Sequence, residues 1–165
     1  MKTLVAYFSV SGNTKKIAQE LAQIEGADLY EIVPAKAYTA EDLDWKNKES
    51  RTTKEMSDPN CRPELAGEKL NMDEYDTIFL GFPLWWEREP SVVDTFLTSY
   101  NFEGKIIFPF CTSGGSAMKM TCERINNLLE RKAKVAEGKR LGGDISKEDL
   151  KLWSVGHGFL AFLLS

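Results

Sequence analysis

The segment that most constrains the fold is an apolar run at residues 4–8, LVAYF, which leads through a short polar loop into a helical pattern. A continuous apolar run of this length is typical of a strand buried on both faces, as in parallel sheets. After the loop, apolar residues recur at helical spacing, at Ile17, Ala18, Leu21 and Ala22. Gly26 is placed to end this helix. The chain therefore begins with a buried strand followed directly by an amphipathic helix.

The loop between this strand and this helix, residues 9–14, carries three hydroxyl side chains, one glycine and one amide. Hydroxyls donate hydrogen bonds, Gly12 allows a close backbone approach or a positive φ, and the first amides of a helix attract an anion. These properties suit a phosphate group. The same residues also suit an ordinary strand-to-helix turn, so the loop alone leaves both interpretations open.

Strand and helix patterns alternate through most of the remaining chain. The further strand patterns are at residues 27–33, 75–80 and 105–110, and the further helical patterns are at residues 91–100 and 118–129. Ser91 and Asp94 have the spacing of a capping box at the start of the first of these helices. Pro109 stands near a strand end, where a missing N–H is tolerated. The alternation predicts an α/β fold, a parallel sheet built from βαβ units with helices on both faces.

Residues 34–72, between the second and third strand patterns, form a connection longer than α/β proteins usually have. Pro59, Pro63 and the many charges of this segment argue against one continuous element. The four residues that start at Thr39, TAED, have the pattern of a helix cap. They predict a helix that runs towards Met56.

The C-terminal tail, residues 154–165, is atypical. A helix is expected from a cap at Ser146 through Leu152, and we expect Gly156 and Gly158 to interrupt it. The tail then becomes strongly apolar, FLAFLL, but it is far too short to cross a bilayer. Burial, self-association and disorder are the interpretations that this tail leaves open.

Composition places the chain in a broad class. Its 165 residues carry a net charge of −4 and are 42% hydrophobic, which indicates one globular domain, residues 1–165. An acidic chain without a basic stripe gives no support for nucleic-acid binding. The three cysteines form no C-x-x-C pair, which favours a reducing compartment. The sequence has neither a signal-peptide layout nor an apolar run that could span a membrane, so we expect a cytoplasmic protein.

Other catalytic and nucleotide motifs are missing or misplaced. The chain has no G-x-x-x-x-G-K-[ST] sequence, and its one G-x-G-x-x-A match begins at Gly156, where no βαβ unit follows. The single histidine, His157, lies in the same tail, which argues against a Ser-His-Asp hydrolase. Cysteine and histidine are too few and too scattered to predict a metal site. Cys111 is more simply a small buried residue than a redox group.

Three loops are expected to meet at one edge of the sheet. Loops that follow the strands of a parallel sheet emerge at its carboxyl edge, where ligands of open α/β sheets bind. The loops are residues 9–14, 81–90 and 112–116. Together they offer hydroxyls and amides for a phosphate, aromatic faces for a planar ring, and a glycine-rich backbone that can approach the ring edges. A phosphorylated aromatic cofactor suits all three.

Trp85 and Trp86 are adjacent in the second loop, between glycine and proline residues. Both cannot face inward on one strand, and Trp is seldom fully buried. One of them could stack on a ligand ring. The alternative is a loop anchor that packs on a neighbouring helix.

The combination of loops resembles the flavodoxin family. The residues YFSVSGNTK after the first strand look like the flavodoxin phosphate loop. The residues GFPLWW and PFCTSGGS are similar to loops of a single-domain flavodoxin-like subgroup with a Trp-Trp second loop. The long segment 34–72, with DLDW at residues 42–45, Arg51 and Arg62-Pro63, also resembles an insertion of that subgroup. The resemblance covers residues 3–153.

This resemblance implies a flavodoxin-like, doubly wound sheet of five parallel strands that binds FMN non-covalently. It places three groups of residues around the cofactor: Ser9, Val10, Ser11, Gly12, Asn13 and Thr14 on the phosphate, Pro83, Leu84, Trp85 and Trp86 beside the isoalloxazine ring, and Thr112, Ser113, Gly114, Gly115 and Ser116 along its other side. The charged residues 87–89, Glu-Arg-Glu, depart from the family pattern and put the packing of the ring in doubt. The apolar tail departs from it as well.

The implied function is electron transfer through bound FMN, with a redox partner protein. The flavin carries the chemistry, so the sequence predicts no catalytic residue. An alternative is an enzyme that takes a hydride from NAD(P)H and reduces quinones or other small molecules. A second alternative is a non-redox binding module on the same fold, because fold does not decide function.

Overall fold

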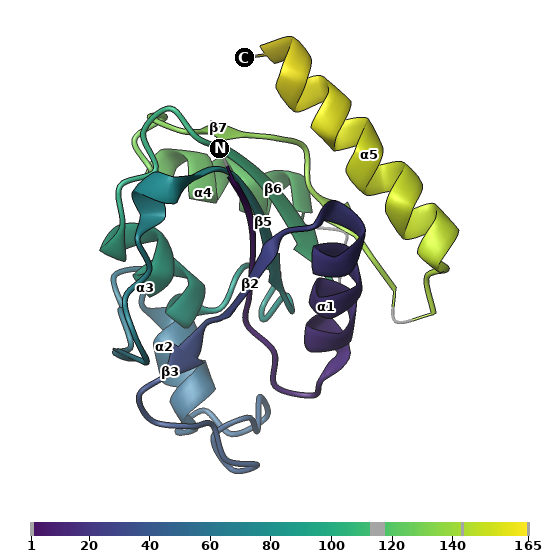
Figure 1. Ribbon diagram of the computed structural model, residues 1–165. Coiled ribbons are helices and arrows are strands. Elements are labelled where there is room, and N and C mark those ends of the chain that lie inside the picture. The colour runs from purple at the N-terminus through teal and green to yellow at the C-terminus, as the bar shows by residue number, and fades with distance from the viewer. Residues whose placement is uncertain (1, 113–117, 143, 165) are drawn as a thin grey trace.

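A parallel sheet forms the centre of the computed structural model, which describes residues 2–112, 118–142 and 144–164 (Figure 1). Its long strands are β1 (Lys2–Tyr7), β2 (Asp28–Glu31), β5 (Tyr75–Phe82) and β6 (Ile106–Cys111). The strand order is β2-β1-β5-β6, and two short strands, β7 (Lys134–Val135) and β8 (Lys139–Arg140), both pair with β6. Every pairing in this sheet is parallel. The structure thus confirms the predicted α/β fold.

The fifth strand position is divided into β7 and β8, and Pro109 of β6 explains the division. The oxygens of Ile107 and Cys111 accept hydrogen bonds from Ala136 and Leu141, at 2.9 and 2.8 Å. Pro109 lies midway between these two acceptors and faces the same neighbouring strand. Because proline has no N–H, the ladder has no donor at this point. The strand pattern 105–110 was predicted, whereas no apolar run marks the two-residue pieces of its neighbour.

Helices cover both faces of the sheet, and alternate residues of each strand supply the two cores. On one face, Val5 and Tyr7 of β1 pack with α1 (Asn13–Glu25) and α5 (Lys147–Leu164). On the other face, Leu4 and Ala6 pack with α3 (Ser91–Ser99) and α4 (Met118–Leu128). Figure 1 shows α1 and α5 on one side of the sheet and α3 and α4 on the other. A strand with apolar residues at every position is therefore buried on both faces, as predicted.

The insertion 34–72 is mostly irregular, with one short helix, α2 (Arg51–Ser57), and a 3₁₀ turn, η1 (Met72–Glu74), at its end. The strand predicted at residues 27–33 is shorter than expected. After β2 ends, β3 (Val33–Pro34) leaves the main sheet and pairs antiparallel with β4 (Leu65–Ala66). The start of the insertion is therefore paired with a later segment of it in a small two-stranded ribbon.

The helix predicted from Thr39 is wrong. Thr39 and Asp42 form the reciprocal hydrogen bonds of a capping box, at 2.9 and 3.1 Å, but the segment that follows makes only turns. The helix starts instead at Arg51, and the hydroxyl of Ser50 caps it by accepting from the Thr53 amide. A cap pattern satisfies the first amides but cannot extend a helix that has few apolar residues on one face.

Two other expected helix boundaries differ from the structure. Ser91 does not cap α3, because Pro90 is the N-cap and the Ser91 hydroxyl donates to the Glu55 carbonyl. In the tail, α5 continues without a break through Gly156 and Gly158 to Leu164. Each glycine in a helix interior lowers helix stability by roughly 1 kcal/mol relative to alanine. The helix forms in spite of these two glycines.

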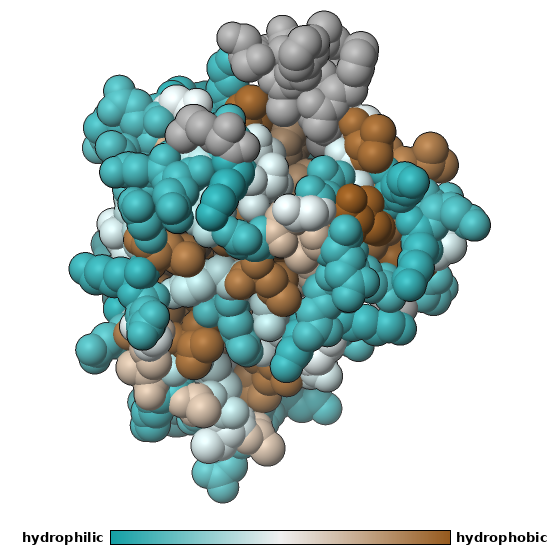
Figure 2. All heavy atoms as spheres, viewed as in Figure 1, coloured by the Kyte–Doolittle hydropathy of each residue, from teal (hydrophilic) through white to brown (hydrophobic). Residues whose placement is uncertain are grey.

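The surface is mainly hydrophilic on the face drawn in Figure 2, where hydrophobic residues form separate patches among polar ones. Within the described residues, no helix combines the length and apolar character needed to cross a membrane.

Candidate functional site

A cavity of about 600 Å³ opens at the carboxyl edge of the sheet, between the loops that follow β1 and β5. The chain turns to opposite sides of the sheet from these two neighbouring strands, and such a switch in strand order leaves a crevice for ligands. Ten described residues line the cavity: Val10, Ser11, Thr14, Leu43, Trp45, Thr52, Pro83, Leu84, Trp85 and Trp86.

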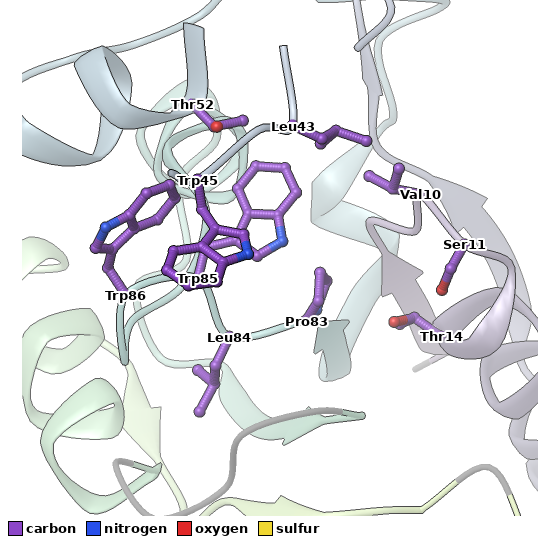
Figure 3. Close-up of a pocket in the computed structure, with 10 residues that line it drawn as sticks. All are labelled: Val10, Ser11, Thr14, Leu43, Trp45, Thr52, Pro83, Leu84, Trp85 and Trp86. Atoms are coloured by element: carbon purple, nitrogen blue, oxygen red, sulfur yellow. The ribbon is translucent and has the colours of Figure 1, made fainter. Parts of the chain in front are cut away.

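The two ends of this cavity differ chemically (Figure 3). The hydroxyls of Ser11 and Thr14 lie at one end, and the indoles of Trp45, Trp85 and Trp86 gather at the other. A ligand that fills the cavity must therefore offer hydrogen-bond acceptors at one end and a large apolar surface at the other.

The first loop turns at Gly12, directly before α1 begins. Gly12 adopts a φ of 94°, and its amide donates to the Ser9 hydroxyl oxygen at 3.2 Å. No side chain caps the start of α1, so its first amides retain their capacity to bind an anion. Val10, Ser11 and Thr14 line the cavity, whereas Ser9, Gly12 and Asn13 complete the loop that shapes it.

Thr14 connects the first loop to the third. Its side chain is almost fully buried, and its hydroxyl lies 2.8 Å from the hydroxyl of Thr112. The amide of Thr112 in turn donates to the carbonyl of Phe82, at the end of β5. Ser113, Gly114, Gly115 and Ser116, which the sequence also predicts at the site, lie outside the described residues.

The second loop is a tight hairpin in which Trp85 and Arg88 exchange backbone hydrogen bonds of 2.9 and 3.1 Å. The two residues between them, Trp86 and Glu87, have positive φ values of 48° and 62°. Residues other than glycine rarely adopt this conformation, which costs on the order of 1–3 kcal/mol each and persists only where the surroundings impose it. The turn thus holds Trp86 at its tip under backbone strain.

Trp85 and Trp86 have different environments. Trp85 is half-buried and makes edge contacts with Phe8 and Tyr38, with ring centroids 5.5 and 5.4 Å apart. Trp86 is 45% exposed. Trp85 is therefore a loop anchor that also lines the cavity, and its stacking on a ligand ring stays a prediction.

Two arginines hold the strained hairpin in place. Arg124 of α4 donates to the Glu87 carbonyl at 2.8 Å. Arg88 reaches the Met56 carbonyl of the insertion and the Asp94 carboxylate of α3, both at 3.3 Å. None of the three charged residues 87–89 is among those that line the cavity, so the indole end carries no charge from this segment.

A cluster of buried charges lies behind the hairpin. It contains Glu89 and Asp94, and Arg124, Arg88 and Arg62 surround them. Glu89 Oε2 and Asp94 Oδ1 are buried without a hydrogen-bond partner. Burial, and next the Glu89 carboxylate, raise the pKa of Asp94 to about 8 against the opposing effect of the arginines. The Asp94 carboxyl group therefore holds its proton to a higher pH than a free aspartate does.

The insertion supplies a wall of the cavity that sequence reasoning missed. Leu43, Trp45 and Thr52 come from residues 34–72 and line the cavity opposite the strand ends. Thr52 donates from its hydroxyl to the Asp42 carbonyl at 2.7 Å, which closes the turns of this segment onto α2. The sequence signal for this role is Trp45, a large aromatic residue in a segment that is otherwise charged and irregular.

Tyr38 anchors the insertion, because a side chain of the insertion itself holds its hydroxyl while its ring packs on Phe8 of the core. The Tyr38 hydroxyl donates to Glu55 at 2.6 Å, and Arg51 donates to the same carboxylate at 2.7 Å. The Arg51 guanidinium also lies 3.9 Å from the centroid of the Tyr38 ring. Burial and the bond to Glu55 raise the pKa of Tyr38. Because the Tyr38 ring contacts both Phe8 and Trp85, it joins the insertion to the core and to the second loop.

A family model for flavodoxin matches residues 2–156. The chain belongs to the flavodoxin family. Among the described residues of this flavodoxin, no group of three or more His, Cys, Asp or Glu side chains is arranged to hold a metal ion. The parallel α/β fold and its switch in strand order are consistent with this family assignment.

Solved structures of related proteins share this fold over most of their length. A candidate flavoprotein from Bacteroides uniformis ATCC 8492 is 42% identical, with a TM-score of 0.86 over 92% of this chain and 96% of that one. A second from Bacteroides eggerthii DSM 20697 is 39% identical, with a TM-score of 0.85 over 92% and 94%. A flavoprotein from Lactobacillus acidophilus NCFM, solved in complex with FMN, is 25% identical, with a TM-score of 0.70 over 84% and 92%. No curated protein matches this flavodoxin.

Proposed function

We propose that this flavodoxin binds FMN non-covalently in the cavity at the carboxyl edge and serves in electron transfer. The observation that carries the proposal is the division of one cavity into a hydroxyl end and an indole end. FMN has a phosphate monoester at one end and a planar aromatic ring at the other, and the residues present fit both. The FMN complex of the Lactobacillus acidophilus flavoprotein supports the proposal.

Each group of residues has a separate part in holding the cofactor. Ser11, Thr14 and the first amides of α1 would bind the phosphate, and Pro83, Leu84, Trp85 and Trp86 would contact the ring. The loop 112–116 is proposed to line the other side of the ring through its backbone. Bound flavin supplies the capacity to accept and donate electrons, and the protein binds it, orients it and sets its surroundings.

The absorbance spectrum of the purified protein tests this proposal. We expect a yellow protein whose flavin is released as FMN on denaturation, or a colourless protein that becomes yellow and binds added FMN stoichiometrically. Protein that stays colourless and fails to bind added FMN would instead support a non-redox binding module.

A reductase of small molecules is the second candidate, favoured by the two exposed indoles at the cavity, Trp45 and Trp86. Such an enzyme takes its electrons from NAD(P)H, whereas a carrier takes them from a redox partner protein. Consumption of NAD(P)H with a quinone and without an added reductase distinguishes the two. The three cysteines form no disulfide, which supports a cytoplasmic setting for either function.

The apolar end of α5 supports one further proposal about partners. The helix continues to Leu164, through the apolar sequence FLAFLL, beyond the residues that the family model matches. We propose that this end contributes to self-association, which sedimentation of the full chain at several concentrations would detect as a rising average mass.

A further inference from the structure

We propose that a second cavity, formed by the insertion alone, binds a small multivalent anion with carboxylate or phosphate oxygens. The cavity has a volume of about 360 Å³, and its walls come from residues 35–36, 51–55 and 61–64. No described residue lines both this cavity and the one at the carboxyl edge of the sheet. The proposal goes beyond the proposed function, because it requires neither bound FMN nor electron transfer.

Each of the three segments that form this cavity contributes one cationic side chain. Lys36 follows β3, Arg51 begins α2, and Arg62 lies between α2 and β4. A ligand with several anionic oxygens can pair with more than one of these groups at once, whereas a monovalent anion cannot use them all. The distribution of the cations therefore favours a multivalent anion.

The two arginines are held in place, yet each keeps hydrogen-bond donors for a ligand. Arg51 donates from Nε to Glu55 and from Nη1 to the Lys36 carbonyl, both at 2.7 Å. Arg62 donates from Nη1 to two carbonyls of the residues before it, at 3.0 and 2.8 Å. Within the described residues, neither arginine donates a hydrogen bond from Nη2. Fixed guanidinium groups with free donors suit carboxylate and phosphate oxygens.

The two carboxylates of the cavity oppose an anion only in part. Glu55 accepts hydrogen bonds from both the Tyr38 hydroxyl and Arg51, so its charge is already compensated. Glu64 is exposed, and water solvates its charge. Lys36 forms no ion pair in the part of the chain that the structure describes. Its ammonium is therefore available to a ligand.

The buried charge cluster behind the hairpin adds to the positive potential of this cavity. Arg62 belongs to both, because its guanidinium lies 3.8 Å from the Asp94 carboxyl group. Burial raises the pKa of Asp94 to about 8, so at neutral pH this carboxyl group is largely protonated. The other carboxylate of the cluster, Glu89, is paired with Arg124 at 3.6 Å. The charge of Arg62 is thus left largely uncompensated, and an anion in the cavity would balance it.

The size and walls of the cavity allow a small carbon skeleton as well as an inorganic ion. Its volume lies at the lower end of the range for small-molecule sites. Ala35 and Pro63 supply apolar surface between the charged groups. A small polycarboxylate and a small phosphate ester share the chemistry that this cavity would recognise.

Isothermal titration calorimetry of the FMN-loaded protein tests the proposal, at neutral pH and constant ionic strength. Tricarballylate and inorganic phosphate are the two probes, and monovalent butyrate is the control ligand. Bound FMN would occupy the phosphate loop, so that free phosphate reports on the second cavity. We expect one saturable site per chain for at least one of the two probes, and binding of butyrate that is at least about tenfold weaker.

Three variants locate the site. We expect K36M to weaken binding of the probe about fivefold, because one cation is lost from the cavity wall. K48M makes the same change at an exposed lysine of the insertion that does not line the cavity, and it is expected to have no effect. We expect E64Q to strengthen binding about twofold, because it removes a carboxylate that repels the anion.

The outcomes separate this site from the FMN site. Absence of saturable binding by both probes would overturn the proposal, and so would unchanged binding in K36M, an equal loss in K48M, weaker binding in E64Q or equal binding of butyrate. Tighter binding of tricarballylate would support a carboxylate ligand, and tighter binding of phosphate would support a phosphate-bearing one. Failure of the protein to bind FMN would overturn the proposed function alone, because K36M and K48M locate the anion in the FMN-free protein as well.

Discussion

Thr14 is almost completely buried, yet its hydroxyl is one of the few polar groups that face the cavity. Its bond to Thr112 fixes the hydroxyl between two loops that lie 98 residues apart. We expect T14A to weaken FMN binding by about 1–3 kcal/mol, because the phosphate loses a donor and Thr112 loses its partner. A flavin-fluorescence titration measures this.

The conservative variant T14S keeps the hydroxyl and is the control for the same titration. We expect its FMN affinity to stay close to that of the wild-type protein. Unchanged affinity in T14A would place the phosphate away from this loop.

Gly81 shows how closely β5 approaches its neighbour. A methyl group at this position would overlap the ring of Phe110, which is fully buried on the same face of the sheet. We expect G81A to lower the free energy of unfolding by about 1–3 kcal/mol, as overpacking of a core does. Urea denaturation followed by far-UV circular dichroism measures it.

Gly156 offers the opposite test within the same chain. Nothing lies within 4 Å of a methyl group added there, in the middle of α5. We expect G156A to raise the free energy of unfolding by up to about 1 kcal/mol through helix propensity. If G81A were as stable as the wild-type protein, the contact with Phe110 would not limit the size of residue 81.

At the scale of elements, the hairpin of residues 85–88 contains backbone strain that a single substitution can relieve. Glu87 has a φ of 62°, and the group that Arg124 binds is its backbone carbonyl, so the glutamate side chain is dispensable there. We expect E87G to raise the free energy of unfolding by about 0.5–1 kcal/mol. This gain is the backbone strain that glycine relieves, reduced by the conformational entropy that glycine adds to the unfolded chain.

The variant E87A removes the same carboxylate but keeps the Cβ and therefore the strain. We expect it to give no gain in urea denaturation. A gain of equal size in both variants would show that charge, and not backbone conformation, is the source.

The sequence predicted elements well where local pattern and tertiary packing agree. The apolar runs of β1, β5 and β6 are buried on both faces of the sheet, so local pattern and tertiary packing favour the same strands. The pattern at Thr39 failed because its capping bonds form in a single turn as readily as in a helix. The Ser91 pattern failed because the hydroxyl has a partner 36 residues away, which no local pattern contains.

In the candidate site, too, residues with a local sequence pattern were predicted, and residues placed only by tertiary packing were missed. Val10, Ser11, Thr14 and the four residues 83–86 were predicted from loops after strands, and the structure places them around one cavity. Trp45 and its neighbours in the insertion were not predicted, because only the folded connection brings residues 41–52 over the strand ends. Irregular segments held by single side chains, such as Arg51, carry no periodic signal.

At the scale of the whole molecule, the buried charge cluster joins the insertion, the hairpin, α3 and α4 through Arg62, Arg88, Asp94 and Arg124. The folded protein binds the Asp94 proton more tightly than the unfolded chain does, in which aspartate titrates near 3.8. The free energy of unfolding therefore falls as the pH rises from about 4 to about 8, by at most about 1.4 kcal/mol per pH unit for one proton.

The substitution D94N replaces the titrating carboxyl group of Asp94 with an amide that does not titrate. We expect the variant to gain stability relative to the wild-type protein as the pH rises from 5 to 8, in urea denaturation at several pH values. D73N, at an exposed position in η1, is the control and is expected to show no such trend. A difference between D94N and the wild-type protein that does not change with pH would contradict a raised pKa of Asp94.

The proline in β6 has a consequence for how separate copies of this protein meet. Beyond Pro109 the sheet ends in two strands of two residues each, which carry Lys134, Lys139 and Arg140. A long, uncharged border strand would offer its free amides and carbonyls to a neighbouring molecule and would let sheets grow from one molecule into the next. An edge strand that is divided into two short pieces and carries positive side chains provides no such template. The missing N–H that interrupts the ladder thus makes this edge of the sheet a poor template for pairing with another copy.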